Sequence, residues 1–224
     1  MSTVIMMEKW EAHVIHGGLT TTTKMPSKSY GTPTALCVTG FKMAQIEGSV
    51  CFDCYAMKGN YHMYANNIEP AQHARYEAML YDPAWCDARV ASIIGDLYFR
   101  WFDSGDIPSL YALERIVEVC VRTPATLHWL PTREYAMVKA YITKHGRDSI
   151  PDNLIIRLSA MYPDQPVKIP LSLQGIKNVL TSNVHTKGAV PTGSECGASK
   201  RGGRCGPCRD CWDTGVEAVS YPKH

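Results

Sequence analysis

The sequence predicts an α/β fold, in which parallel strands alternate with helices to form a partial (β/α) barrel of the TIM-barrel type. Two patterns lead to this prediction. Strand-like segments rich in aromatic and β-branched residues recur from residue 98 onward, and stretches with helical periodicity separate them. The chain has 224 residues, fewer than the roughly 250 that a complete eightfold barrel usually needs. An open doubly wound sheet is the architectural alternative.

The expected elements follow one another along the chain. A helical stretch is expected after Cys54, and residues 70–98 have helical spacing behind Asp82-Pro83. Two further helices are expected, one capped by Ser109 and the other ended by Gly146. Their ranges are 109–122 and 133–146, and the expected strands are 98–102, 126–130, 153–160 and 177–184.

The chain is expected to form a single domain with three parts. Residues 1–36 are polar and Thr-rich, with Pro26, Gly31 and Pro33 breaking any regular element, so we expect a loop-rich lead-in. Residues 37–190 form the α/β core, and residues 191–224 form a Cys-rich C-terminal tail.

Composition and charge exclude several classes of protein. The chain is 45% hydrophobic and 20% charged with a formal net charge of +2, which is ordinary globular composition and gives no argument for nucleic-acid binding. No apolar run is long enough to cross a bilayer, and Glu8, Lys9 and Glu11 interrupt the apolar start, so we expect neither a membrane span nor a signal peptide. A cytoplasmic location, where thiols stay reduced, is therefore expected.

Seven of the nine cysteines fall into two groups at opposite ends of the sequence, which is typical of metal sites. The N-terminal cysteine group consists of Cys37, Cys51 and Cys54. The C-terminal cysteine group consists of Cys196, Cys205, Cys208 and Cys211. The remaining two, Cys86 and Cys120, lie among apolar residues in helical stretches and are expected in the core.

The C-terminal cysteine group has the more specific spacing. Two-residue gaps turn the last three thiolates toward one centre, much as in bacterial ferredoxins, and Cys196 supplies a fourth ligand. A [4Fe–4S] cluster is the leading interpretation, and structural zinc fits the same four thiolates. The CGPC tetrapeptide also matches a redox dithiol, but a third cysteine follows it at once. The basic residues around the group would offset the charge of the centre: Lys200, Arg201, Arg204 and Arg209.

The N-terminal cysteine group offers only three thiolates. Such a site leaves one iron open to another ligand or takes a fourth group from elsewhere in the chain. The Cys51-x2-Cys54-Tyr55 element resembles the end of the radical S-adenosylmethionine motif. It departs from that motif in the gap of thirteen residues after Cys37 and in Asp53, which replaces an aromatic residue. One shared centre and two separate centres both remain open at this point.

Polar residues follow the expected strands, where parallel α/β folds bind their ligands. They would line a cleft for a small polar or anionic ligand, and five of them are candidate catalytic residues: Asp103, Asp106, Arg133, Arg157 and His185. Structural roles compete at these positions. Asp106 suits a helix cap, Arg157 could pair with an acid, and a lone histidine is more often structural than catalytic.

Several motifs together resemble the phage gene product 88-like family. They are KMPSKSYGTPTALC, CFDCYAMKGNY, RWFDSGDI, LHWLPTREY, PDNLIIRLS and CGPCRDCW with the terminal YPKH, and they cover most of residues 24–224. The resemblance implies a bacteriophage protein made in the cytosol of an infected bacterium, with cysteines that carry a metal centre. A looser similarity to radical S-adenosylmethionine proteins implies a related, degenerate barrel.

The leading hypothesis is therefore a [4Fe–4S] protein with a role in electron transfer or radical-type chemistry, acting with a redox partner or a small polar ligand. The alternative is a zinc-stabilised module that binds nucleic acid or a host protein through its C-terminal basic residues. The sequence leaves open whether the protein is an enzyme, which cysteines share a centre, and the oligomeric state.

Overall fold

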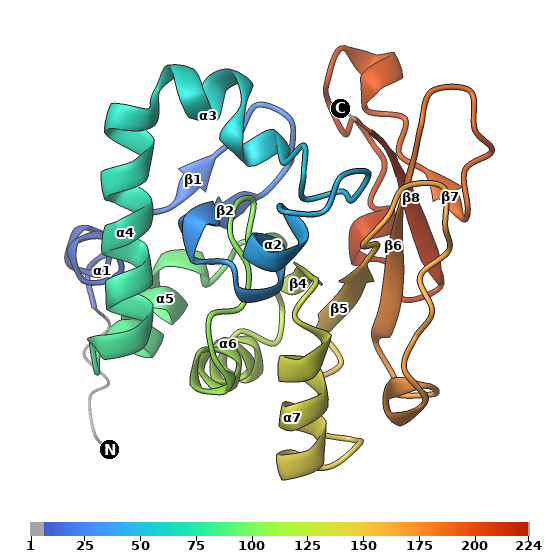
Figure 1. The fold of residues 1–224 in the computed structure, drawn as a ribbon. Coiled ribbons are helices and arrows are strands. Elements are labelled where there is room, and N and C mark those ends of the chain that lie inside the picture. The colour runs from blue at the N-terminus through green and yellow to red at the C-terminus, as the bar shows by residue number, and fades with distance from the viewer. Residues whose placement is uncertain (1–6, 224) are drawn as a thin grey trace.

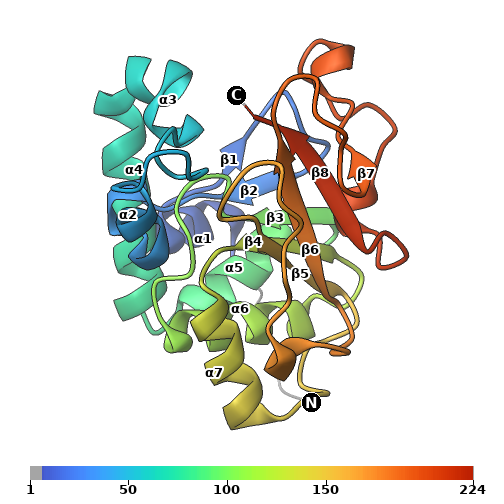
Figure 2. The ribbon, with the colours of Figure 1, turned by 45° about the vertical axis from the view of Figure 1, so that its right-hand side comes forward.

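A single mostly parallel sheet organises the protein. The computed structural model describes residues 7–223, and the sheet has eight strands in the order β1-β2-β3-β4-β5-β6-β8-β7 (Figures 1 and 2). Strands β1 and β2 pair in antiparallel fashion, and the other neighbours are parallel. The strands are β1 (Thr20–Thr21), β2 (Lys28–Tyr30), β3 (Tyr98–Trp101), β4 (Leu127–Thr132), β5 (Leu154–Ser159), β6 (Val179–His185), β7 (Ser194–Glu195) and β8 (Ala218–Pro222).

Seven α-helices accompany the sheet in the described part of the chain. They are α1 (Lys9–His16), α2 (Val38–Met43), α3 (Gly59–Met63), α4 (Ala65–Tyr81), α5 (Trp85–Ile93), α6 (Leu110–Arg122) and α7 (Tyr135–His145). None of these helices combines the length and the apolar character that a bilayer crossing requires.

The strand order confirms the predicted α/β class. From β2 to β6, neighbouring strands in the sheet follow their order in the chain, without the reversal that defines a doubly wound sheet. Right-handed crossovers in an unreversed order place the connecting helices on the same side. Helices α5, α6 and α7 accordingly pack on one face of the sheet, which we call the helix face (Figure 2).

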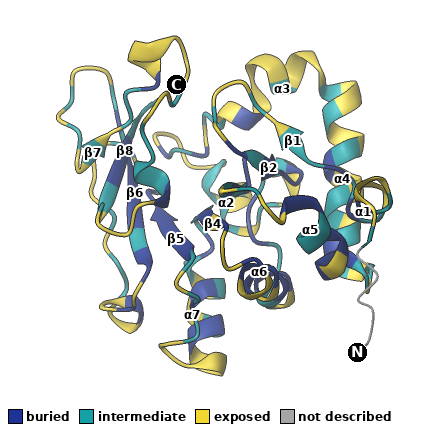
Figure 3. Cartoon of the chain, turned by 180° about the vertical axis from the view of Figure 1, so that it is seen from behind, coloured by how far each residue is buried: buried dark blue, intermediate teal, exposed yellow. Residues whose placement is uncertain are grey.

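The two faces of the sheet are covered by different side chains. In β3, Phe99 and Trp101 point to the helix face and join an apolar core with residues of α5 and α6. Tyr98 and Arg100 point to the opposite face, where Tyr98 contacts Trp212 of the C-terminal segment. All six residues of β5 are buried, as expected for a strand covered on both sides (Figure 3).

Most of the elements expected between residues 98 and 185 are present. Helix α6 begins after Ser109, whose hydroxyl accepts a hydrogen bond from the Ala112 N–H, and α7 ends at Gly146, which has φ of 93°. The stretch 70–98 is divided, since α4 ends before Asp82-Pro83 and α5 begins after it. Cys86 and Cys120 are buried in the core on the helix face.

The two ends of the chain contain more regular structure than the sequence predicts. The lead-in holds α1, β1 and β2, and the C-terminal tail holds β8, which lies inside the sheet between β6 and β7. These strands are two to five residues long and have little periodicity of their own. Pairing decides their conformation, as in the parallel register of Ser29 with Arg100.

Two buried histidines make the stability of this core depend on pH. His16 bonds to Ser92 from α1, and His128 bonds to Thr123 from β4. Burial lowers the pKa of each imidazole from 6.5 to about 3, so both stay neutral in the folded protein.

Acidification below pH 6.5 should therefore destabilise the fold, because the unfolded chain takes up protons that buried His16 and His128 cannot accept. Each histidine contributes up to about 1.4 kcal/mol per pH unit between its two pKa values. Asp106 has a pKa raised to about 6, chiefly by burial, so its protonation stabilises the fold on acidification. The test therefore compares the pH dependence of the free energy of unfolding between wild type and variants. In urea unfolding at pH 4 to 7, the free energy of unfolding should depend less steeply on pH in His128→Gln than in wild type. His73→Gln, at an exposed position, should not reduce this dependence. Parallel profiles for wild type and His128→Gln would contradict this account.

Candidate functional site

The N-terminal cysteine group lies in the segment between β2 and α3. Cys37 precedes α2, and Cys51 and Cys54 lie in one turn, where the Cys54 N–H donates to the Cys51 carbonyl at 3.2 Å. A Cβ on Gly40 would lie 3.6 Å from the Cys37 sulfur and 3.8 Å from the Cys51 sulfur, so both sulfurs face the same point. A side chain there would also come within 2.9 Å of the Cys37 Cβ, which explains the glycine.

This segment is fixed to the carboxyl edge of the sheet, the edge at which β3 to β6 end (Figure 1). Glu134, after β4, accepts hydrogen bonds from the Thr39 N–H at 2.6 Å and from its hydroxyl at 2.7 Å. The Val50 N–H donates to the carbonyl of Met161, after β5, at 2.9 Å. The first cysteines are thus placed where parallel α/β folds bind ligands.

Two carboxylates and one guanidinium act on the thiols of this group. Burial raises the pKa of Cys37 above its usual range, and Asp106, Cys54, Cys51 and Glu134 raise it further. Burial also raises the pKa of Cys51, although the Arg133 guanidinium opposes the effect. Without a bound cation the Cys37 and Cys51 thiols are therefore protonated.

Asp106 is held by donors from the ends of β3 and β4. Its carboxylate accepts from the Thr132 hydroxyl at 2.6 Å, the Arg133 N–H at 2.8 Å and the Ile107 N–H at 2.8 Å. Burial raises its pKa to about 6 in spite of these bonds. The helix cap that the sequence offers as an alternative is not formed by Asp106, because Ser109 caps α6 and Asp106 instead joins the ends of β3 and β4.

Asp103 and Arg133 also lie at the carboxyl edge. The Tyr61 hydroxyl donates to the Asp103 carboxylate at 3.1 Å, while the other carboxylate oxygen of Asp103 is buried without a hydrogen bond. The Arg133 Nε donates to the Ala160 carbonyl at 2.9 Å. The structure therefore brings Asp103, Asp106 and Arg133 together around the N-terminal cysteine group.

The C-terminal cysteine group lies elsewhere, on the face of the sheet opposite the helices. Its backbone is attached to distant strands and loops: the Cys196 N–H donates to the Ser220 carbonyl, and the Cys205 N–H donates to the Lys24 carbonyl, both at 2.8 Å. Cys205 and Cys211 each have Cys196 as an electrostatic neighbour. Burial raises the pKa of Cys211 to about 12, partly offset by a 3.2 Å hydrogen bond with the Tyr221 hydroxyl.

Arg157, a candidate from the sequence, holds this group in place. The side chain is fully buried in β5 and donates to the carbonyls of one short segment of the C-terminal tail instead of pairing with an acid. The accepting carbonyls are Asp210 at 2.8 Å, Cys211 at 3.2 Å, Asp213 at 3.0 Å and Val216 at 2.9 Å, and Thr181 of β6 accepts at 3.1 Å. Its role is to position Cys211.

His185 lies away from the N-terminal cysteine group and next to the strand β7 segment that leads into Cys196. Its Nδ1 bonds to the Ser220 hydroxyl at 2.8 Å between β6 and β8, and its Nε2 lies 4.0 Å from a Glu195 carboxylate oxygen. It is buried and contributes to the pairing of two strands.

Arg100 lies between the two cysteine groups and was not among the residues predicted from sequence. Its guanidinium donates to the Tyr55 hydroxyl at 3.3 Å, next to Cys54, and its charge acts on Cys205 and Cys211. The ring of Trp129 lies 4.6 Å from its Cζ, and its Nε is buried without a hydrogen bond. The one sequence signal is an arginine in the middle of the aromatic strand YFRWF.

The cysteines form no disulfide bonds. All nine are free thiols. Within residues 7–223, no group of three or more His, Cys, Asp or Glu side chains is positioned so that it could hold a metal ion. The raised thiol pKa values agree with this arrangement, because a metal binds the thiolate and must displace the proton.

The redox-dithiol interpretation of the CGPC sequence has less support. Burial raises the pKa of both Cys205 and Cys208. A redox-active dithiol needs a thiol whose pKa is lowered, usually at the start of a helix. Here Cys208 is followed by a single 3₁₀ turn, Asp210–Trp212.

Replacing Arg157 with Met should lower the free energy of unfolding by about 3 kcal/mol or more, because several buried carbonyls lose their donor. It should also expose residues 205–216 to limited proteolysis. Arg147→Met is the matched control, since Arg147 donates to a carbonyl from the surface, and it should cost less than about 1 kcal/mol. A protein with Arg157→Met that unfolds at the wild-type urea concentration would rule out the positioning role.

The comparisons with known proteins place the chain in a family. No curated protein and no solved structure matches it. The family described as Gene product 88 matches over residues 12–214, a range that includes all seven clustered cysteines together with Arg100 and Arg157. The chain belongs to the Gene product 88 family.

Proposed function

We propose that this protein binds iron–sulfur clusters through its two cysteine groups and acts in electron transfer or radical-type chemistry. One observation carries the proposal: free thiols far apart in the sequence are electrostatic neighbours in the fold, Cys37 with Cys51 and Cys54 at the carboxyl edge, and Cys196 with Cys205 and Cys211 on the opposite face. Clustered reduced cysteines in a protein without disulfides are typical of metal binding.

The charges around the C-terminal cysteine group support a thiolate-bound centre there. Arg100 and Arg157 both act on Cys211, and neither has a carboxylate oxygen within 4.0 Å among the described residues. More distant carboxylates act on them, Asp103 on Arg100 and Asp210 and Asp213 on Arg157, and an anion at closer range would further offset the cost of desolvation. Four thiolates around a [4Fe–4S] cluster or a zinc ion would supply net negative charge at this place.

The donor set of the N-terminal cysteine group fits a cluster with an open position. Three thiolates next to Asp106 and Glu134 repel one another, and a bound cation would add to the positive charge that Arg133 supplies. Both carboxylates already accept hydrogen bonds from the chain, so they support the segment and leave three thiols as the ligands. The fourth position would then be available to a ligand from outside the chain, as the resemblance to radical enzymes also implies.

The charge environments of the two groups differ, and this difference favours two centres with different reduction potentials. Cations near a cluster raise its potential, and carboxylates lower it. A cluster next to Arg100 and Arg157 would therefore accept electrons more readily than one next to Asp106 and Glu134. This difference suits electron transfer within one chain. Reductive formation of 5′-deoxyadenosine from S-adenosylmethionine would instead establish the radical-type role.

The fold and location complete the proposal. The unreversed order of β2 to β6, with helices on one face, supports a partial (β/α) barrel as the finer description of the fold. The C-terminal cysteine group then occupies the side that would be the barrel interior. As a member of a phage family with reduced thiols, the protein would act in the cytosol of an infected bacterium.

A structural zinc site in the C-terminal cysteine group is the alternative, because four thiolates suit zinc equally well. Its proposed partner, nucleic acid or a host protein, has less support. Lys200 pairs with Glu195 at 2.7 Å, and Arg209 donates to the carbonyls of Gly206 and Cys208, so part of the basic surface is used within the chain.

Protein purified without oxygen should be brown, absorb near ~400 nm and contain about eight iron and eight sulfide per chain if both groups hold a four-iron cluster. Iron and acid-labile sulfide are measured by colorimetric assay, and zinc by mass spectrometry. Colourless protein with one zinc per chain would replace the iron–sulfur proposal by the zinc alternative.

Cysteine substitutions should separate the two centres. Cys51→Ala should remove about half of the iron, and Cys208→Ala should remove the other half and destabilise the tail, because metal binding and folding are linked. Cys86→Ala is the control, since Cys86 lies in the core on the helix face and should leave the iron content unchanged. Loss of all iron from either single variant would show one shared centre.

A further inference from the structure

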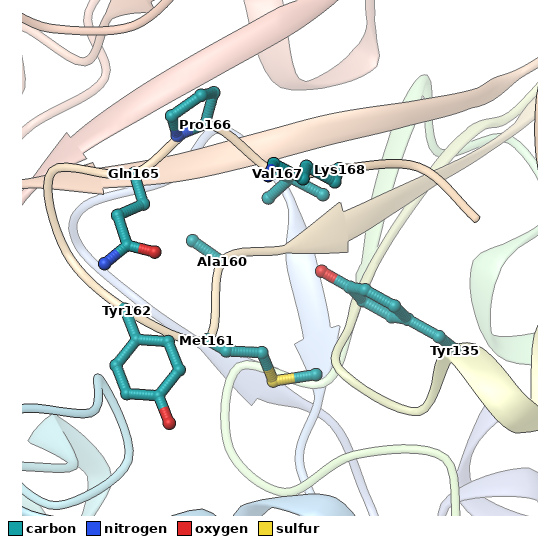
Figure 4. A pocket seen from close by; sticks show the side chains of 8 residues that line it. All are labelled: Tyr135, Ala160, Met161, Tyr162, Gln165, Pro166, Val167 and Lys168. Carbon is teal, nitrogen blue, oxygen red and sulfur yellow. The ribbon is translucent and has the colours of Figure 1, made fainter.

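A cavity opens at the carboxyl end of β5, and neither cysteine group uses it. Its volume is about 480 Å³, which is the size of a small-molecule site. Its wall is formed by the start of α7 and by the loop that follows β5, residues 160–168. Figure 4 shows Tyr135 on one side of Ala160 and Tyr162 and Gln165 on the other, with Met161 between them.

The loop that forms this cavity is held in one conformation. Asp164 has φ of 58°, an uncommon value for a residue with a side chain, and its N–H donates to the Val184 carbonyl at 2.8 Å. Its carboxylate accepts from the Thr186 N–H at 2.8 Å and from the Thr186 hydroxyl at 2.7 Å. The Val167 N–H donates to the Asn183 side chain at 2.8 Å. Because β6 anchors the loop at these points, the cavity exists before any ligand binds.

The lining combines flat apolar surfaces with a cation. Tyr135, Met161, Tyr162 and Val167 provide rings and apolar atoms, and the Gln165 amide and Lys168 ammonium provide polar groups. No acidic residue lines the cavity, and Lys168 forms no ion pair with the described residues. Such a lining favours a planar ring that carries a negative charge.

The cavity adjoins the N-terminal cysteine group through shared backbone contacts. The Met161 carbonyl accepts from Val50, the residue before Cys51, at 2.9 Å. The Ala160 carbonyl accepts from the Nε of Arg133 at 2.9 Å, and the charge of the same guanidinium acts on Cys51. A molecule in the cavity would therefore lie beside the cysteine turn.

We propose that this cavity binds a small molecule that joins a planar aromatic ring to an anionic group, with the ring between Tyr135 and Tyr162 and the anion at Lys168. The proposal extends the proposed function by naming the class of ligand that meets the N-terminal cysteine group. No cysteine lines the cavity, so its test does not depend on iron.

The test measures the affinity of the metal-free full-length chain for four probes by titration calorimetry. Adenosine 5′-monophosphate and 1-naphthoate carry both a ring and an anion, whereas adenosine lacks the anion and ribose 5-phosphate lacks the ring. At least one of the first two should bind at least tenfold more tightly than both single-feature probes. If only adenosine 5′-monophosphate binds tightly, the ligand is a nucleotide, and if only 1-naphthoate does, the ligand is an aromatic carboxylate.

Variants then assign the binding to this cavity. Lys168→Ala and Tyr162→Ala should each weaken binding about tenfold or more, which corresponds to about 1.4 kcal/mol. Lys177→Ala is the control, because Lys177 is an exposed lysine that precedes β6, at the opposite end of the strand, and pairs with Asp152. The tightly bound probe should also bind protein with Cys51→Ala, so a failed iron assay leaves this result intact. The proposal is wrong if neither ring-bearing anion binds at millimolar concentration or if Lys168→Ala binds like wild type.

Discussion

The placement of the C-terminal cysteine group depends on a guanidinium buried in the central strand of the sheet. Arg157 lies in β5, where every side chain is buried, and its donors are satisfied by carbonyls of residues 210–216 and by Thr181. These bonds hold Cys211 against Tyr221 and within electrostatic range of Cys196. Carbonyl dipoles satisfy the hydrogen bonds of a buried cation but do not neutralise its charge. A negatively charged centre nearby would do so.

The two cysteine groups differ in their surroundings, although both consist of reduced thiols. The N-terminal cysteine group is attached to the ends of β4 and β5 through Glu134 and Met161, in the neighbourhood of buried acids. The C-terminal cysteine group covers the face opposite the helices, in the neighbourhood of arginines. Arg100 contacts Tyr55 from the first segment and acts on the thiols of the second. Strand β3 therefore supports both groups through the guanidinium of Arg100.

The cavity after β5 extends this organisation to a third component. It opens at the edge of the sheet where the N-terminal cysteine group is attached, and Arg133 contacts the backbone of its wall. Parallel sheets commonly bind ligands at this edge, because the loops there can vary without disturbing the strands that carry them. Neighbouring strands hold the loop of residues 160–168 and the cysteine turn, so the positions of both are fixed relative to the sheet.

The sequence by itself determined the α/β class, the elements between residues 98 and 185, and the division of the cysteines into two groups. Helical and strand periodicity, the Ser109 cap and Gly146 are local features, and local features can be recognised without knowledge of the fold. Only the tertiary structure decided that β2 and β8 join the sheet and that Arg157 binds carbonyls. It also decided that Arg100 lies between the cysteine groups. Of the candidate catalytic residues, it brought together Asp103, Asp106 and Arg133 but not His185. The physical reason is distance along the chain. Arg157 and its partner carbonyls in the C-terminal tail lie more than fifty residues apart, and spacing within a motif carries no information about contacts of that range.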